Sequence, residues 1–205
     1  MSIVIEALVT NAAGARRAES RGARRLELCA EPDLGGTTPS LETLAAVRAG
    51  CALPVMCMVR PRGGDFVYTP AELAEMRRSI EDFKAAGAAG VVFGALTTES
   101  TWDLGSMREL AHLARPMLVT AHRAFDHLKD KRAGLEALVE LGIERVLTSG
   151  GAPTAAQGEE QLSKLVGQAA GRIVILAGAG VNGNNMDELI AKTGVREVHG
   201  SWWAR

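Results

Sequence analysis

Two glutamates and two histidines are the residues of this chain that are best suited to chemistry: Glu6, Glu27, His122 and His199. Each lies in or directly after a short apolar segment with the composition of a β-strand. Paired carboxylates beside a histidine suit proton transfer, because crowding raises the pKa of one carboxyl group while a neighbouring cation keeps the other ionised. We predict catalytic roles for all four, with a glutamate as base and a histidine as acid. A satisfied polar cluster inside the core is the alternative.

Polar loops after the predicted strands contain candidate ligand-binding residues. Arg60 and Arg62 flank Pro61, and the two glycines that follow allow Asp65 to fold back toward them. Guanidinium groups bind carboxylates or phosphates in bidentate geometry, whereas an internal arginine–aspartate ion pair would only hold the loop. Glycine-rich turns let backbone N–H groups approach an anion, or they serve as simple tight turns. The predicted ligand-binding set is Arg60, Arg62, Asp65, Arg123, Asp126, Ser149, Gly178, Gly180 and Ser201.

One aspartate in this set has two possible partners. Asp126 follows His122 and Arg123 in the segment His-Arg-Ala-Phe-Asp. If it orients His122, the two residues form an acid–base pair, because a carboxylate fixes the orientation of an imidazole. If it pairs with Arg123, its role is to hold the loop.

A sequence repeat indicates the strands and helices that position these residues. Four glycines, each after an amphipathic run, are followed at the same offsets by a short apolar segment, and each can cap a helix in left-handed geometry. Between successive copies the sequence has room for a second strand–helix unit, and further apolar segments begin near residues 3, 54, 116 and 172. Eight strands alternating with helices predict an α/β fold, the (β/α)8 TIM barrel, as a single domain over residues 1–205. The four glycines are Gly22, Gly87, Gly142 and Gly194.

The helical pattern stops one element short of a complete barrel. Helices are expected at about 11–21, 40–49, 70–86, 103–114, 131–141, 157–170 and 184–193. After the eighth strand the chain reads Ser201-Trp202-Trp203-Ala204-Arg205, so we expect the barrel to lack its eighth helix. We expect the outer face between the eighth and first strands to be exposed or covered by a partner, and we predict a homo-oligomer. A loosely held C-terminus is the alternative.

Strand alternation predicts which side chains meet inside the barrel. If Leu26 and Leu28 face the helices, Glu27 and Cys29 point inward. The repeat places His199 at the position equivalent to Glu27, and Glu6 lies on the first strand between them. The pattern therefore predicts a cluster of the two glutamates with His199 near the C-terminal ends of the strands, where barrel enzymes have their active sites.

Composition limits the class of protein. The chain has 205 residues, of which 47% are hydrophobic and 4% aromatic, and a net charge of −1 without blocks of like charge. Nucleic acid and membrane are therefore not expected as partners. No signal peptide is visible, and three cysteines without CxxC spacing indicate reduced thiols and a cytoplasmic location.

Five segments together resemble the CutC family. They are Arg25–Cys29, Gly35–Ser40, Met58–Phe66, His122–Asp126 and Leu147–Gly150. The resemblance runs from Glu6 to His199 and implies a TIM barrel, a cytoplasmic protein, oligomers and copper homeostasis through Cu(I) binding. It carries over one metal-binding position, Cys29. The family's Glu-x-Cys reads Glu-Ala-Leu here, so an inward methionine such as Met58 would be the second soft ligand.

Several functions remain open at this point. The first is copper homeostasis, with Cu(I) as the candidate cofactor. The second is a metal-independent enzyme that acts on a small polar or anionic substrate, sugar-like or phosphate-like. The two glutamates and two histidines also suit a divalent ion if their spacing permits. A barrel retained as an oligomeric binding scaffold is a further alternative.

Overall fold

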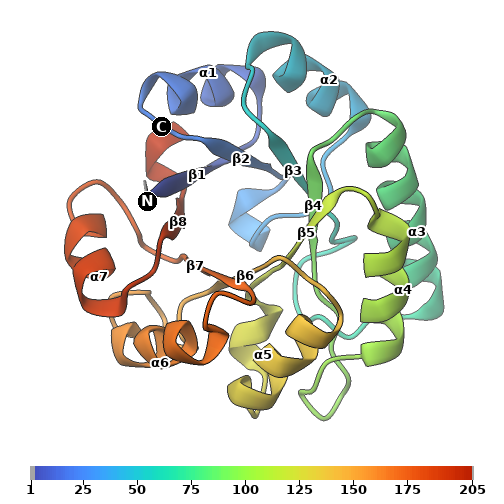
Figure 1. The fold of residues 1–205 in the computed structure, drawn as a ribbon. Coiled ribbons are helices and arrows are strands. Elements are labelled where there is room, and N and C mark those ends of the chain that lie inside the picture. The colour runs from blue at the N-terminus through green and yellow to red at the C-terminus, as the bar shows by residue number, and fades with distance from the viewer. Residues whose placement is uncertain (1–2, 205) are drawn as a thin grey trace.

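Eight parallel strands form a closed barrel in which each strand is hydrogen-bonded to the next and β8 pairs with β1 (Figure 1). The computed structural model describes residues 3–204. The strands are β1 (Val4–Val9), β2 (Arg25–Leu28), β3 (Val55–Met58), β4 (Gly90–Phe93), β5 (Leu118–Ala121), β6 (Arg145–Thr148), β7 (Val174–Ala177) and β8 (Glu197–Gly200). This order confirms the predicted (β/α)8 fold.

Seven α-helices surround the barrel, and each predicted helix agrees with the structure to within two residues at either end. They are α1 (Ala12–Ser20), α2 (Leu41–Gly50), α3 (Pro70–Ala85), α4 (Leu104–Ala114), α5 (Lys131–Glu140), α6 (Glu159–Ala169) and α7 (Met186–Thr193). Three short 3-10 helices lie in the loops: η1 (Pro32–Leu34), η2 (Arg123–His127) and η3 (Trp202–Ala204). Within residues 3–204, β8 is followed by η3 and by no α-helix.

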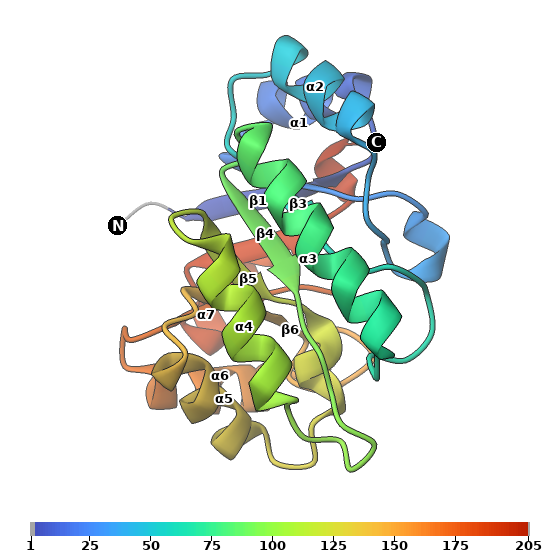
Figure 2. The ribbon, with the colours of Figure 1, turned by 90° about the vertical axis from the view of Figure 1, so that its right-hand side faces the viewer.

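Local sequence signals explain where the helices begin. α3 starts at Pro70 because Thr69 and Glu72 form a capping box: the Thr69 hydroxyl accepts the N–H of Glu72, and the Glu72 carboxylate accepts the N–H of Thr69 at 2.7 Å. The adjacent helices α3 and α4 lie side by side (Figure 2), with α3 against β4 and α4 against β5. The β3–α3 loop, which ends at this capping box, carries several residues of the site described below.

The hydrophobic core has two parts. The larger part fills the space between strands and helices and contains most buried apolar side chains, including Phe83, Phe93 and Cys57. The smaller part lies inside the barrel and consists of Cys29, Met56, Met58 and Val92, with Leu8 against it. Side chains that alternate along a strand therefore separate into these two cores, as the predicted strand phase requires.

The short helix η3 covers part of the outer face beside β1. Trp203 is buried, and the Arg17 guanidinium donates to the carbonyl of Ala204 at 2.9 Å. Trp202 remains 42% exposed, with Arg21 over its ring at 5.8 Å. The burial of Trp203 comes from within the chain. The homo-oligomer stays a prediction.

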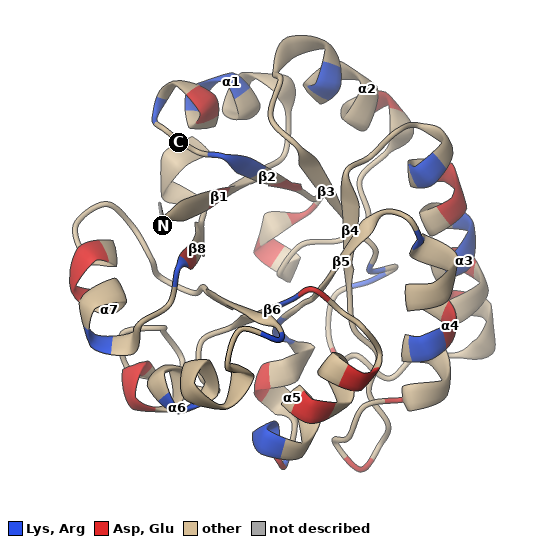
Figure 3. Cartoon of the chain, in the orientation of Figure 1, with Lys and Arg blue, Asp and Glu red and all other residues tan. Residues whose placement is uncertain are grey.

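Charged residues of both signs alternate around the outer helices, and a few lie on the strands themselves (Figure 3). The strand charges are concentrated on β1, β2, β6 and β8: Glu6, Arg25, Glu27, Arg145 and Glu197. Within residues 3–204, no helix has the length and hydrophobicity needed to cross a membrane.

Candidate functional site

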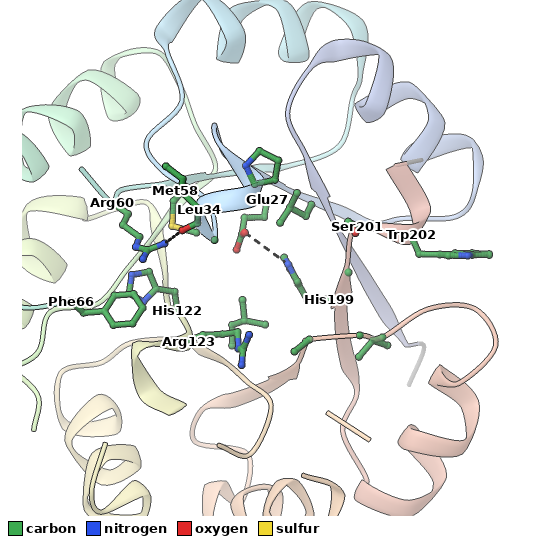
Figure 4. A pocket seen from close by; sticks show the side chains of 18 of the residues that line it. Glu27, Leu34, Met58, Arg60, Phe66, His122, Arg123, His199, Ser201 and Trp202 are labelled. Carbon is green, nitrogen blue, oxygen red and sulfur yellow. Dashed lines mark hydrogen bonds and ion pairs between the residues drawn. The ribbon is translucent and has the colours of Figure 1, made fainter. Parts of the chain in front are cut away.

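A cavity of about 560 Å³ opens at the C-terminal end of the barrel (Figure 4). Its wall combines acidic, basic and apolar side chains, among them Glu27, Arg60, Phe66, His122, Arg123 and His199. The cavity therefore lies at the C-terminal ends of the strands, the end of the barrel at which the sequence predicts the active site.

Three ionisable residues meet at the floor of this cavity. The register of β1 and β8 places Glu6 directly opposite His199. His199 Nδ1 lies 2.9 Å from Glu6 Oε1, and His199 Nε2 lies 3.9 Å from Glu27 Oε1. One ligand atom from each residue fits within 4.8 Å of the others. The structure therefore brings together the three residues that strand alternation placed in one cluster.

A buried chain of ion pairs supports this cluster from below. Arg25 pairs with both Glu6 and Glu197, and Arg145 Nε lies 3.2 Å from Glu197 Oε2. Arg25 precedes Glu27 by two residues on β2, so the same alternation that turns Glu27 inward also turns Arg25 inward. Strand phase alone was therefore a sufficient signal for Arg25, although the predicted cluster did not include it.

The two carboxyl groups differ sharply in acidity. Burial raises the pKa of Glu27 to about 7, and the nearby Glu6 charge adds to this effect, against the attraction of His199. Burial has the same tendency at Glu6, but the hydrogen bond from His199 and the Arg25 charge outweigh it and lower the pKa of Glu6 to about 2. Glu6 is therefore ionised at neutral pH, while Glu27 exchanges a proton there.

His199 lies between these carboxylates. Burial opposes its charged form, but the Glu27 and Glu6 carboxylates outweigh burial and raise the pKa of His199. Since Nδ1 faces Glu6, the other nitrogen of the ring is directed toward Glu27. His199 is thus suited to hold a proton at Nε2, whereas Glu27 has a buried oxygen, Oε2, with no hydrogen-bond partner among the described residues.

His122 is in a different state. Its Nδ1 accepts the backbone N–H of Ala124 at 3.2 Å, so the proton of the neutral ring is on Nε2. Burial and the Arg60 charge lower the pKa of His122 to about 3. His122 is therefore a neutral hydrogen-bond donor at physiological pH, and the predicted acid role is better matched by His199.

Arg60 is buried at the wall of the cavity and binds backbone carbonyls. Its Nη1 donates to Leu34 at 2.9 Å and to Gly36 at 3.2 Å, and its Nη2 donates to Gly64 at 2.8 Å. The guanidinium carbon lies 4.8 Å from the centre of the Phe66 ring. Arg60 thereby joins the β2–α2 and β3–α3 loops at the mouth of the barrel.

The other two residues predicted in this loop face away from the cavity. Arg62 pairs with Asp65 at 2.9 Å and with Glu72 at 2.6 Å, and the Asp65 side chain is 71% exposed. Neither Arg62 nor Asp65 lines the cavity. Of the two alternatives that the sequence left open, the internal ion pair describes this arginine–aspartate pair.

Asp126 binds Arg123 and the loop after β6 rather than His122. Its carboxylate accepts from Arg123 Nε at 2.8 Å, from Ser149 Oγ at 3.0 Å and from the Gly151 N–H at 3.0 Å. Arg123 lines the cavity. Asp126 and Ser149 therefore position Arg123 and stand outside the cavity wall.

The two glycines predicted to bind an anion after β7 have different surroundings. The N–H of Gly178 donates to the Thr148 carbonyl at 3.0 Å, which removes it from the predicted anion-binding turn. Gly180 has a φ of 75°, and it lines the cavity together with Ser201. Of the two predicted glycines, Gly180 therefore lines the cavity and Gly178 does not.

Cys29 lies inside the barrel, within contact distance of the same glycine as Met58. A Cβ added to Gly36 would lie 3.4 Å from Cys29 Sγ and 3.6 Å from Met58 Cε. Burial, with a smaller effect of the Glu27 charge, raises the pKa of Cys29 to about 12, so the free thiol is protonated. Cys29, directly after β2, and Met58, at the end of β3, belong to the same inner cluster, and both carry the soft sulfur donors that Cu(I) prefers.

Several residues that line the cavity were not predicted from the sequence, among them Phe66, Asn182 and Trp202. Phe66 contacts His122, with ring centroids 4.8 Å apart. Their loops follow no strand phase, so no periodic signal indicates which of their side chains turn inward.

Comparisons with known proteins identify the family of this chain and agree with its barrel fold. The CutC family model matches residues 3–204. A protein named "family protein CutC" from Parabacteroides distasonis is 43% identical over 98% of this chain and 83% of its own, and the "Copper homeostasis protein cutC homolog" of Homo sapiens is 42% identical over 96% and 72%. The crystal structure of a CutC protein from Streptococcus agalactiae superposes with a TM-score of 0.92 at 29% identity, covering 98% of this chain and 99% of that one. The chain belongs to the CutC family.

Proposed function

We propose that the barrel mouth is the active site of a metal-independent enzyme that transfers a proton on a small polar substrate. Glu27 is the base and His199 the acid. The observation that supports this assignment best is Glu27 itself, a fully buried carboxyl group at the cavity floor with a pKa of about 7 and an oxygen that has no partner in the described part of the chain. A base of this acidity removes a proton near neutral pH and releases it again.

Glu6 and Arg25 orient His199, the proposed acid. Glu6 stays ionised because Arg25 pairs with it, and the ionised carboxylate accepts from His199 Nδ1. The proton that His199 can donate is therefore the one on Nε2, on the side of Glu27. In the proposed reaction the substrate's proton passes to a Glu27 carboxylate oxygen, and His199 Nε2–H protonates the oxygen on which negative charge develops.

Hydrogen exchange tests this proposal without a known product. Small hydroxy and carbonyl compounds are incubated with the protein in deuterium oxide, and loss of carbon-bound hydrogen is followed by proton NMR. We expect exchange in at least one compound, reduced at least a hundredfold by Glu27→Gln and unchanged by Glu160→Gln, an exposed glutamate on α6. Exchange that is equal in Glu27→Gln and the native protein would exclude Glu27 as the base.

A second function, copper homeostasis through Cu(I) binding, is supported by Cys29 and Met58, whose side chains both lie near Gly36, and by the names of the relatives. Here copper is the cargo, held on the inner wall beside the cavity. Chelator competition under reducing conditions tests it. We expect one Cu(I) to bind, with affinity lost in Cys29→Ser and kept in Cys57→Ser, whose thiol lies in the outer core. Equal affinity in both variants would contradict this site.

We also propose a cytoplasmic location. The three cysteines, Cys29, Cys51 and Cys57, are all free and buried. Unpaired thiols are typical of reducing compartments.

A further inference from the structure

We propose that Arg60 binds the carboxylate of the ligand, so that the substrate is a small monocarboxylate whose reacting end lies toward Glu27. This assignment rests on the proposed function for the role of Glu27. Arg60 itself lies on the opposite wall of the same cavity.

Arg60 carries a buried charge without a counter-ion. The residue is only 5% exposed, and among residues 3–204 no carboxylate lies within ion-pair distance of its guanidinium. The other arginines of the barrel mouth and interior are neutralised: Arg25 by Glu6 and Glu197, Arg145 by Glu197, and Arg123 by Asp126. Its neighbours are backbone carbonyls and the Phe66 ring, none of which carries a negative charge. A buried cation in such surroundings favours an anion beside it.

Arg60 also has unused donors. Arginine has five N–H groups, and Arg60 uses three of them on the carbonyls of Leu34, Gly36 and Gly64. Its Nε is buried and has no partner within residues 3–204. One edge of the guanidinium therefore has N–H groups left for the two oxygens of a carboxylate.

His122 supplies a further donor at the same wall. Its Nε2 is also buried with no partner in the described chain, and the Nδ1 bond to Ala124 keeps the proton on Nε2. Phe66 contacts both groups, at 4.8 Å from the Arg60 guanidinium carbon and 4.8 Å from the His122 ring centre. All three residues line the cavity, and the Phe66 ring is half-buried. A ligand that displaces this ring would reach both donors.

Charge balance favours a carboxylate over a phosphate. One positive charge is uncompensated at this wall, and Arg123 already pairs with Asp126. A monoanion neutralises Arg60, whereas a phosphate dianion would leave a buried negative charge. Figure 4 shows Arg60, Phe66 and His122 on one side of the cavity and Glu27 with His199 on the other. A ligand held at Arg60 can therefore extend toward the base.

Binding of three probes tests the inference: glycolate, its uncharged analogue ethylene glycol, and inorganic phosphate. Affinities are measured by calorimetry at pH 7, and the histidine side chains are observed in long-range proton–nitrogen NMR spectra, with the His122 signals assigned from their loss in His122→Asn. We expect glycolate to bind at least tenfold more tightly than either other probe and to shift the Nε2 resonance of His122. Tighter phosphate binding, equal binding of ethylene glycol, or an unmoved resonance would each overturn it.

Two lysine variants test whether Arg60 is the arginine that binds glycolate. Arg60→Lys keeps the charge and loses the planar donor edge, so glycolate affinity should fall at least tenfold, while the matched change Arg62→Lys should leave it unchanged. Because Arg60 also holds three loop carbonyls, Arg60→Lys can fail to fold. In that case the probe comparison and the His122 resonance of the native protein decide the question.

The same measurements separate the two proposals. Glycolate binding is repeated with Glu27→Gln, which removes the base and leaves Arg60 in place. Carboxylate binding at Arg60 without Glu27-dependent exchange of any compound would refute the proposed enzyme and keep the anion site. Glu27-dependent exchange confined to uncharged compounds would keep the proposed enzyme and refute carboxylate binding at Arg60.

Discussion

The residues of the site show how one barrel gives similar groups different properties. Glu6 and Glu27 are both fully buried, yet Arg25 and His199 bind Glu6 directly, and one Glu27 oxygen has no partner between residues 3 and 204. The same contrast holds for the histidines, since carboxylates surround His199 and Arg60 lies near His122. Neighbouring charge, more than residue type, assigns the base, the acid and the neutral donor.

At this scale we predict an acid-dependent loss of stability caused by His122. Its pKa is about 3 in the folded protein and 6.5 in an unfolded chain, so its contribution is complete above pH 6.5 and is lost as the pH falls toward 3. In urea unfolding from pH 7.5 to 4, this group should leave the free energy of unfolding unchanged above pH 6.5. Below pH 6.5 it should lower the free energy of unfolding by at most about 1.4 kcal/mol per pH unit. His122→Asn should flatten that slope.

The matched control is His112→Asn, at an exposed position on α4. It should leave the pH dependence unchanged. A His122→Asn profile parallel to that of the native protein would show that His122 becomes charged in the folded state.

At the scale of elements, alternation along short strands predicted most of the site. It placed Glu27 and Cys29 inward, and the repeat added His199 without any tertiary information. The loops resisted such reasoning: Arg62 also pairs with Glu72 on α3, and Asp126 also binds Ser149 after β6, neither of which the sequence indicated. Strand phase is a local property of the backbone, whereas loop contacts depend on which distant segment lies beside them.

We predict that β4 tolerates no side chain at Gly90. A Cβ there would lie 2.2 Å from Met56 Cε and 2.5 Å from the Leu118 carbonyl oxygen. Gly90→Ala should therefore lower the free energy of unfolding by about 1–3 kcal/mol. Part of this overlap is with a flexible side chain, so the double variant with Met56→Ala should be less destabilised than the sum of the single variants.

Denaturant unfolding of all four proteins measures this coupling. Gly167→Ala is the control, because a Cβ at Gly167 meets no atom within 4 Å. Strict additivity of Gly90→Ala and Met56→Ala would show that the inner core accommodates the methyl group elsewhere.

At the scale of the whole molecule, the outer face between β8 and β1 is the distinctive region. Within residues 3–204 only η3 follows β8, and it presents Trp202 with 42% of its surface exposed. The homo-oligomer predicted from the sequence would cover this face. We expect light scattering to give a mass above that of one chain, and Trp202→Ser to reduce it. A monomeric native protein would contradict the prediction.

The hydrogen bond between Glu6 and His199 joins residues 193 positions apart and spans the closure between first and last strands. A ribosome must therefore synthesise the chain as far as His199 before the acid of the proposed site exists, and a nascent barrel that lacks β8 is expected to be inactive. A ligand that contacts both β1 and β8 would also stabilise the closed barrel. Circular permutants opened at an outer loop should keep both the reaction and this stabilisation by the ligand. The order in which the strands are synthesised can change as long as β1 and β8 still pair.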